Sequence, residues 1–170
     1  QINRRQFIGR SAAAVALTTL RPGMSFAASG DTLTIRAPGD IDTVDPGFWK
    51  NTSDLWVMDA VFPRLINFTT GSKWEWELYS AESISQRDAT TIDFKLKPGS
   101  MWTNGYGELT TADVKFSFER YLDKELAAET ADNWALLDHV EIHDKYSGSI
   151  HLKEPFAPLW WFVLPYATGS

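Results

Sequence analysis

The histidines and carboxylates near residue 140 have the residue types of a metal site. In an extended strand His139, Glu141 and His143 would share one face, because side chains alternate with a period of two. Two imidazoles and a carboxylate suit a transition metal. The same spacing is also typical of the solvent-exposed face of a strand whose opposite face buries Val140 and Ile142. We favour this second interpretation, because a flat strand supplies no groups to orient the ligands, and we predict no metal and no cofactor.

Two further patterns are incomplete versions of known sites. The run GYGE at residues 105–108 precedes a predicted helix, but it lacks a third glycine and places a carboxylate where a pyrophosphate needs donors. Asp40, Asp42 and Asp45 lack the glycine and the bidentate glutamate of a calcium loop. The chain has no cysteine and three scattered histidines, and it has no nucleophile-elbow pattern. We therefore predict no catalytic residues and a protein that is not an enzyme.

An aromatic and polar loop follows residues 45–46 and carries the candidate ligand-binding residues. Aromatic walls with a few well-placed polar groups line many ligand sites. The alternative, which spacing alone leaves equally open, is that Trp49 packs the loop onto the core. The candidates in this loop are Phe48, Trp49, Lys50, Asn51 and Thr52.

Composition is that of an ordinary globular protein. The 170 residues suffice for about one domain, and 44% of them are hydrophobic and 22% charged. Lys and Arg number 16 against 22 Asp and Glu, for a net charge of -6. This balance argues against a nucleic-acid partner, because phosphate neutralisation needs clustered basic residues. Eight tryptophans are the unusual feature, since indole rings are large amphipathic contact surfaces.

Residues 1–28 differ from the rest, because they contain four arginines and no acidic residue. Arg4 and Arg5 precede Phe7 and a short apolar stretch at residues 11–17, and small residues end the segment. The stretch is too short to span a bilayer. The pattern predicts a twin-arginine signal peptide and a periplasmic location. The alternative is a basic amphipathic helix in the mature chain.

The remaining residues predict a mixed α/β fold. Strands are expected at residues 32–37 and 65–68. The helix expected between them is capped by Thr52 or Ser53, stops at Pro63 and carries an apolar face of Leu55, Met58, Val61 and Phe62. Hairpins are expected over residues 81–97, with a turn at 87–89, and over residues 140–152, with a turn at 146–148. Further helices are expected after a capping box at residues 110–113, over residues 127–137, and after residue 158. The first of these helices should face the core with a stripe of Val114, Phe118, Tyr121 and Leu122.

The runs LKPGSMWTNG at residues 96–105 and ELTTADVKFSFER at residues 108–120 form a long and specific motif. They closely resemble the signature of the periplasmic substrate-binding proteins of peptide/nickel-type ABC transporters, the oligopeptide- and dipeptide-binding family 5. The resemblance extends over residues 31–165. The sequence departs from the family pattern at Val44, at residues 74–78 and at residues 87–90.

The resemblance implies the N-terminal portion of a bilobed periplasmic-binding fold of type II with an extra small domain. Residues 29–68 would open lobe I, residues 69–155 would form the extra α+β domain, and residues 156–170 would begin the return to lobe I, where the chain is truncated. The implied function is capture of a peptide or other small solute and its delivery to an inner-membrane permease, by a protein that is monomeric at full length. An exported carbohydrate- or surface-binding module is the alternative, ahead of an exported enzyme.

The resemblance also implies where the solute lies. In peptide-binding relatives the segment after the Asp-Pro turn runs along the ligand and supplies an acid to a peptide ammonium group. Lys50 stands where that acid is expected, which favours an anionic or sugar-like solute beside Trp49. Trp134 is placed by the resemblance where the extra domain reaches the cleft, and it completes the set of candidate residues.

Overall fold

The computed structural model describes residues 34–71, 73 and 75–166. The chain divides into two units, Gln1–Arg36 and Ala37–Ser170, and every element below lies in the second. The predicted signal peptide and the first two residues of the predicted strand at 32–37 lie outside the described residues. Within the described ranges, no helix is long and apolar enough to cross a membrane.

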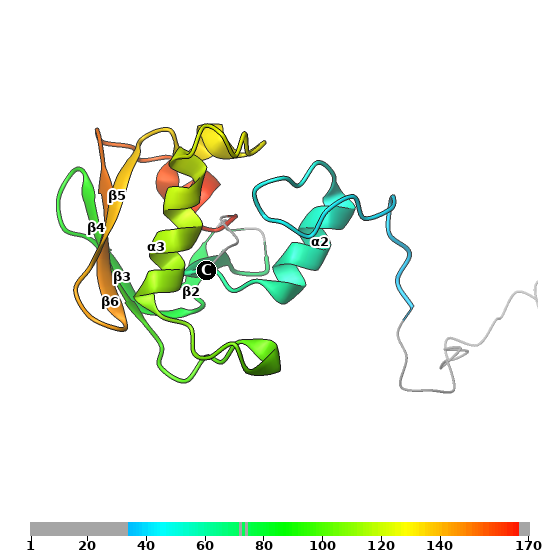
Figure 1. The fold of residues 1–170 in the computed structure, drawn as a ribbon, viewed down its shortest axis with the longest axis horizontal. Helices are drawn as coiled ribbons and strands as arrows, with labels where there is room; N and C mark the ends of the chain where they lie inside the picture. The colour runs from blue at the N-terminus through cyan, green and yellow to red at the C-terminus, as the bar shows by residue number, and fades with distance from the viewer. Residues whose placement is uncertain (1–33, 72, 74, 167–170) are drawn as a thin grey trace, which may run out of the picture. The chain divides into compact units, whose positions relative to one another are not determined.

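A four-stranded antiparallel sheet is the largest element, with the strand order β3-β4-β6-β5 (Figure 1). Both predicted hairpins are confirmed. In β4 the residues Ile92, Phe94 and Leu96 are buried while the residues between them are not, because strand side chains alternate between core and solvent. The strands are β3 (Ala81–Gln86), β4 (Thr91–Leu96), β5 (Leu137–Ile142) and β6 (Ser147–Leu152).

Helix α3 (Thr111–Glu119) packs against the sheet, alongside β5 (Figure 1). The predicted capping box begins it: the backbone N–H of Thr110 donates to the Asp113 carboxylate at 2.7 Å. Val114, Phe118 and Tyr121 are buried and Leu122 is half-buried against the core, which confirms the predicted core-facing stripe. The core between helix and sheet therefore follows from the helical period of this segment.

The chain end completes the same core. A π-helical turn, η4 (Leu159–Val163), follows Pro158 and confirms the predicted helical tail. Leu159, Val163 and Leu164 are buried with the residues of α3 and the sheet.

Helix α2 (Thr52–Val61) precedes a small two-stranded sheet of β1 (Ile66–Phe68) and β2 (Trp76–Leu78). The predicted helix is confirmed, but its N-cap is Asn51 and not Thr52 or Ser53 as predicted. Met58 is buried, whereas Val61 from the expected apolar face is 62% exposed. Strand β2 was not among the sequence predictions.

Two predicted elements are wrong. Residues 127–137 do not form a helix: a short 3-10 turn, η3 (Ala131–Trp134), is followed after two turn residues by β5, which begins at Leu137. The tertiary structure overrides the local pattern because Leu137 pairs with Leu152 in the sheet. Residues 34–37, the described part of the strand predicted at 32–37, form no strand.

The turn between β5 and β6 lies at residues 143–146, earlier than the predicted 146–148. The Asp144 carboxylate accepts hydrogen bonds from the backbone N–H groups of Tyr146 and Ser147, at 2.7 and 2.8 Å. This local turn chemistry leaves Gly148 inside β6.

Candidate ligand-binding wall

Two adjoining hollows lie beside the loop that precedes α2. Trp49, Thr130 and Asn133 line both, and we call the surface of the two hollows the Trp49 wall. The inner hollow has a volume of only about 30 Å³, room for one or two water molecules. The outer hollow is shallow and measures about 460 Å³. The inner hollow is also lined by Pro46, Tyr121, Trp134, Phe162, Val163 and Tyr166, and the outer one by Lys50, Glu129 and Asp132.

The buried carboxylate of Asp54 holds the loop that supplies Trp49 and Lys50. Its Oδ1 accepts from the backbone N–H of Asp42 at 2.8 Å, and its Oδ2 accepts from that of Lys50 at 3.1 Å. Burial by itself raises the pKa of Asp54, but these backbone hydrogen bonds outweigh it, so that the pKa is lowered. The ionised carboxylate therefore fixes the backbone at Lys50.

Asn51 and Thr52 lie at the amino end of helix α2. The Asn51 Oδ1 accepts from the N–H groups of Ser53 and Asp54, at 2.8 and 3.1 Å, and caps α2. Its Nδ2 donates to the Asp42 carboxylate at 2.9 Å. Thr52 is exposed in the first turn of α2, and neither residue lines a hollow.

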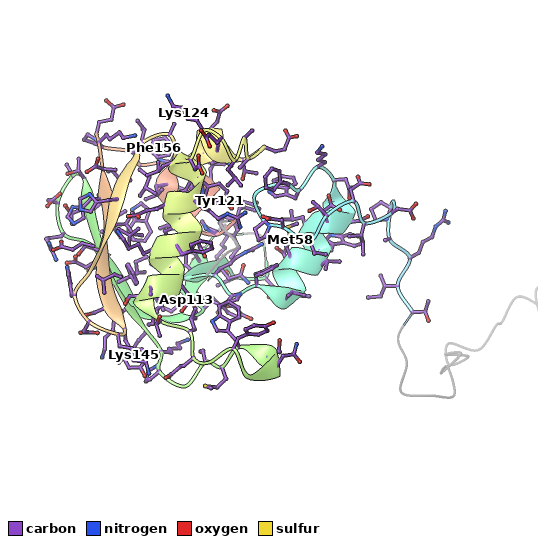
Figure 2. All side chains as sticks on the ribbon, viewed as in Figure 1. Met58, Asp113, Tyr121, Lys124, Lys145 and Phe156 are labelled. Carbon is purple, nitrogen blue, oxygen red and sulfur yellow. The ribbon has the colours of Figure 1, made fainter. Side chains whose placement is uncertain are left out.

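An ion pair joins the loop to the carboxyl end of α3, and we call it the Asp45–Arg120 clasp. The Arg120 Nη2 lies 2.9 Å from the Asp45 Oδ2, while Asp45 Oδ1 accepts from the Gly47 N–H at 2.9 Å. Thr130 donates its backbone N–H to the Gly47 carbonyl at 3.4 Å. A Cβ at Gly47 would lie 3.4 Å from the ring of Tyr121, whose side chain is labelled in Figure 2. Segments 75 residues apart are thus held together at the wall.

The aromatic candidates differ in how much surface they offer. Trp134 is only 3% exposed, and its ring stacks on Tyr121 at 5.7 Å between centroids and lies 4.4 Å from that of Phe118. Phe48 is half-buried and packs against the core. Trp49 is half-buried and lines both hollows. The structure therefore brings Trp49 and Trp134 together on one wall.

Lys50 lines the outer hollow, and its ammonium lies 3.4 Å from the Glu129 carboxylate. Sequence reasoning missed Glu129, Thr130, Asp132 and Asn133 as wall residues. No local signal marks them, because the irregular path of residues 123–134 depends on the tertiary structure.

The face predicted at His139, Glu141 and His143 is confirmed only in part: His139 and Glu141 lie exposed on β5 and Val140 is buried, but His143 follows the strand and Ile142 is 43% exposed. The Glu141 Oε2 lies 3.1 Å from the Nε2 of His151 and 3.5 Å from that of His143. The rings of His139 and His151 stack at 4.5 Å. In the part of the chain that the structure describes, no group of three or more His, Cys, Asp or Glu side chains could hold a metal ion.

The glycine-rich run before α3 forms a turn, with positive φ angles at Gly105 and Gly107. Glu108 at its end accepts hydrogen bonds from the Lys145 ammonium at 2.7 Å, the Gly99 N–H at 2.5 Å and the Tyr146 hydroxyl at 3.0 Å. These donors lower the pKa of Glu108 to about 2.

Comparison with known proteins identifies the family. Residues 75–169 match the model of the bacterial extracellular solute-binding proteins, family 5, middle region. The chain belongs to this family. The resemblance found in the sequence is confirmed, and so is the mixed α/β fold class, because the similar solved structures are periplasmic binding proteins of family 5.

Three solved structures show the likeness in detail. MoaA from A. tumefaciens R10, in complex with mannopinic acid, is 27% identical with a TM-score of 0.69, over 76% of this chain and 27% of that one. AgaA from the same source, in complex with agropinic acid, is 26% identical with a TM-score of 0.67, over 78% and 26%. AppA from Bacillus subtilis, in complex with a nonapeptide, is 25% identical with a TM-score of 0.67, over 73% and 24%.

The present chain therefore spans about a quarter of the length of these solved proteins. All three are solute-binding proteins that hold a small molecule or a peptide. The family is one of extracellular binding proteins rather than enzymes.

Proposed function

We propose that the protein is the extracytoplasmic solute-binding component of an ABC importer. It captures a peptide or another small solute and delivers it to a permease in the inner membrane. The observation that carries the proposal is the family match over residues 75–169, together with a fold shared with three ligand-bound solute-binding proteins. Export by the twin-arginine route, through the signal at residues 1–28, and a monomeric complete protein belong to the same proposal.

The Trp49 wall forms one side of the solute cleft in this proposal. Trp49 and Lys50 contact the solute, because they line the outer hollow with exposed surface. Phe48, Asn51 and Trp134 position them through core packing and the helix cap. Thr52, exposed beside the cap, is the remaining candidate of this loop.

Capture follows from closure of two lobes. Residues 29–68 and 156–170 contribute to lobe I and residues 69–155 form the extra domain, while the opposite side of the cleft comes from the other lobe. A solute that contacts both sides favours the closed state by its differential affinity for that state. The inner hollow, with its 30 Å³, is too small to enclose a solute by itself, which fits a wall that needs a second side.

A thermal-shift assay on the complete protein tests the function. The panel contains mannopinic acid, agropinic acid, a nonapeptide, and di- and tripeptides. A solute that binds the native state raises the Tm, because it stabilises that state. At a solute concentration a hundredfold above Kd the added stability is about 2.7 kcal/mol. Trp49→Ala is expected to abolish the shift, whereas Trp56→Ala, which removes an exposed indole on α2, is expected to leave it.

The outcomes separate the alternatives. A panel with no stabilising solute, together with turnover of any member, would overturn the importer function. Binding restricted to insoluble polysaccharide would instead identify a carbohydrate-binding module.

A further inference from the structure

Strand β5 lies at the edge of the four-stranded sheet, where β6 is its neighbour on one side. The backbone N–H of His143 donates to the Ser147 carbonyl and closes the hairpin. In an antiparallel ladder every second residue then directs its N–H and C=O away from the neighbouring strand. By this alternation Val140 and Ile142 direct their backbone groups outward. An open edge of this kind is a template for the addition of another strand.

Two charged side chains of α3, which lies alongside β5 (Figure 1), occupy the middle of this edge. The Val140 N–H donates to the Glu119 carboxylate at 2.8 Å, and the Val140 carbonyl accepts from the Lys115 ammonium at 2.7 Å. Lys115 and Glu119 also pair with each other at 2.6 Å. Each of these hydrogen bonds includes a charged group and is therefore stronger than one between two peptide groups. We call Lys115 and Glu119 the edge guard.

The edge guard contributes little to the core. The core-facing residues of α3 are Val114 and Phe118, whereas the side chains of Lys115 and Glu119 are 38% and 27% exposed. Among the described residues, these two side chains form hydrogen bonds only with each other and with Val140. Burial raises the pKa of Glu119, but the hydrogen bonds from Lys115 and Val140 outweigh it, so that the pKa is lowered and the carboxylate stays ionised.

A second copy of the chain fits the edge that the guard covers. If two β5 strands paired antiparallel about Val140, the two valines would exchange hydrogen bonds across a two-fold axis. His139 of each copy would then lie opposite Glu141 of the other, because these residues flank Val140 on the same face of the strand. An imidazole can donate to a carboxylate, and opposite charges across neighbouring strands are favourable. The edge is thus self-complementary.

We propose that the edge guard keeps the protein from pairing with a second copy through β5, by holding the backbone groups of Val140 that such a pair needs. An incoming strand would have to displace two charge-assisted hydrogen bonds and replace them with neutral ones, which favours the monomer. The device belongs to the sheet edge and does not depend on the identity of the solute or on transport.

Sedimentation velocity on the complete protein tests the inference. Lys115→Ala combined with Glu119→Ala removes the guard and keeps residues that favour a helix. We expect this variant to form dimers as its concentration rises, while the wild type stays monomeric over the same range. Lys115→Ala alone frees only the Val140 carbonyl and is expected to dimerise more weakly. Glu119→Gln keeps an oxygen that accepts from the Val140 N–H, and it is expected to stay monomeric.

Two controls separate edge pairing from other association. Lys95→Ala with Glu82→Ala removes an ion pair between β4 and β3 of the same sheet, and this variant is expected to stay monomeric. Glu141→Lys, added to the variant without the guard, places a cation opposite His139 of the other copy and is expected to restore the monomer.

Three outcomes overturn the inference. The first is a variant without the guard that is folded by circular dichroism and yet monomeric, or a dimer that Glu141→Lys leaves intact. The second is a wild type that already dimerises and is made monomeric by Glu141→Lys. The third is loss of the fold in both Lys115→Ala and the double variant, because the pair would then be required for folding rather than for protection of the edge.

Discussion

Two carboxylates, those of Glu108 and Asp54, each accept several hydrogen bonds from separate parts of the chain. Glu108 ties its own segment to two others, because it accepts from Lys145 and Tyr146 in the β5–β6 turn and from Gly99 in the turn after β4. Figure 2 labels Lys145, whose side chain carries this contact. Asp54 does the same for the loop at the wall. Each carboxylate organises a loop that has no regular secondary structure.

The pKa of Glu108 predicts how stability depends on pH. The pKa is lowered from 4.5 to about 2 in the folded state, so the stabilisation by Glu108 is complete above about pH 4.5 and is lost as the pH falls toward 2. Glu108→Gln should lower the Tm at pH 7, and the difference from the wild type should shrink steadily between pH 4.5 and pH 2. Thermal melts followed by circular dichroism measure it. Glu154→Gln, at an exposed carboxylate, is the control; a difference for Glu108→Gln that is independent of pH would contradict the assignment.

The strands of the four-stranded sheet pack so closely that one position in β6 has no room for a side chain. Gly148 lies in β6 opposite Phe94 of β4 and Ile142 of β5. A Cβ at this glycine would meet the Glu141 carbonyl at 2.6 Å and the Phe94 ring at 3.0 Å. The glycine is therefore required by the close approach of the strands, although its φ angle is not positive.

Gly148→Ala is expected to destabilise the fold by about 1–3 kcal/mol, because the backbone of β5 must move to admit the methyl group. Urea unfolding gives the difference in free energy. Gly39→Ala is the matched control, since a Cβ there meets nothing within 4 Å, and it should change stability by less than about 0.5 kcal/mol. Equal effects of the two substitutions would show that the β5–β6 approach does not constrain the position.

At the scale of the whole molecule, the Asp45–Arg120 clasp joins the loop before α2 to the end of α3. The pair is partly shielded, with Arg120 at 23% and Asp45 at 39% exposure. It acts beside the Thr130–Gly47 hydrogen bond. Together these contacts set the distance between the two segments that form the Trp49 wall.

A double-mutant cycle measures the clasp. Asp45→Asn, Arg120→Gln and the double variant are expected to give a coupling free energy of about 0.5–1 kcal/mol, as for a partly exposed ion pair. The coupling should fall in high salt, because screening weakens it. Asp132→Asn combined with Arg120→Gln serves as the control cycle and should show additivity. Additive effects in the first cycle would show that the Asp45–Arg120 clasp does not hold the two segments of the Trp49 wall together.

Periodic patterns allowed much of this fold to be predicted from the sequence. The alternation in β4, the stripe in α3 and the capping box at Thr110 are local, since each depends on residues two to four apart. The family resemblance depends on a contiguous motif in the same way. The aromatic loop after Asp45 could also be predicted, because its residues are contiguous in the sequence.

The tertiary structure alone decided the rest. Residues 127–137 had a helical pattern, but sheet pairing of Leu137 and burial of Trp134 imposed a different path. That path places Glu129 and Asn133 beside Trp49, about 80 residues earlier in the chain. Sequence by itself therefore determined the family, the hairpins and the candidate loop, because these have short-range signals. The pairing of Lys50 with Glu129 and of Asp45 with Arg120 comes only from packing between distant segments, and no local spacing encodes it.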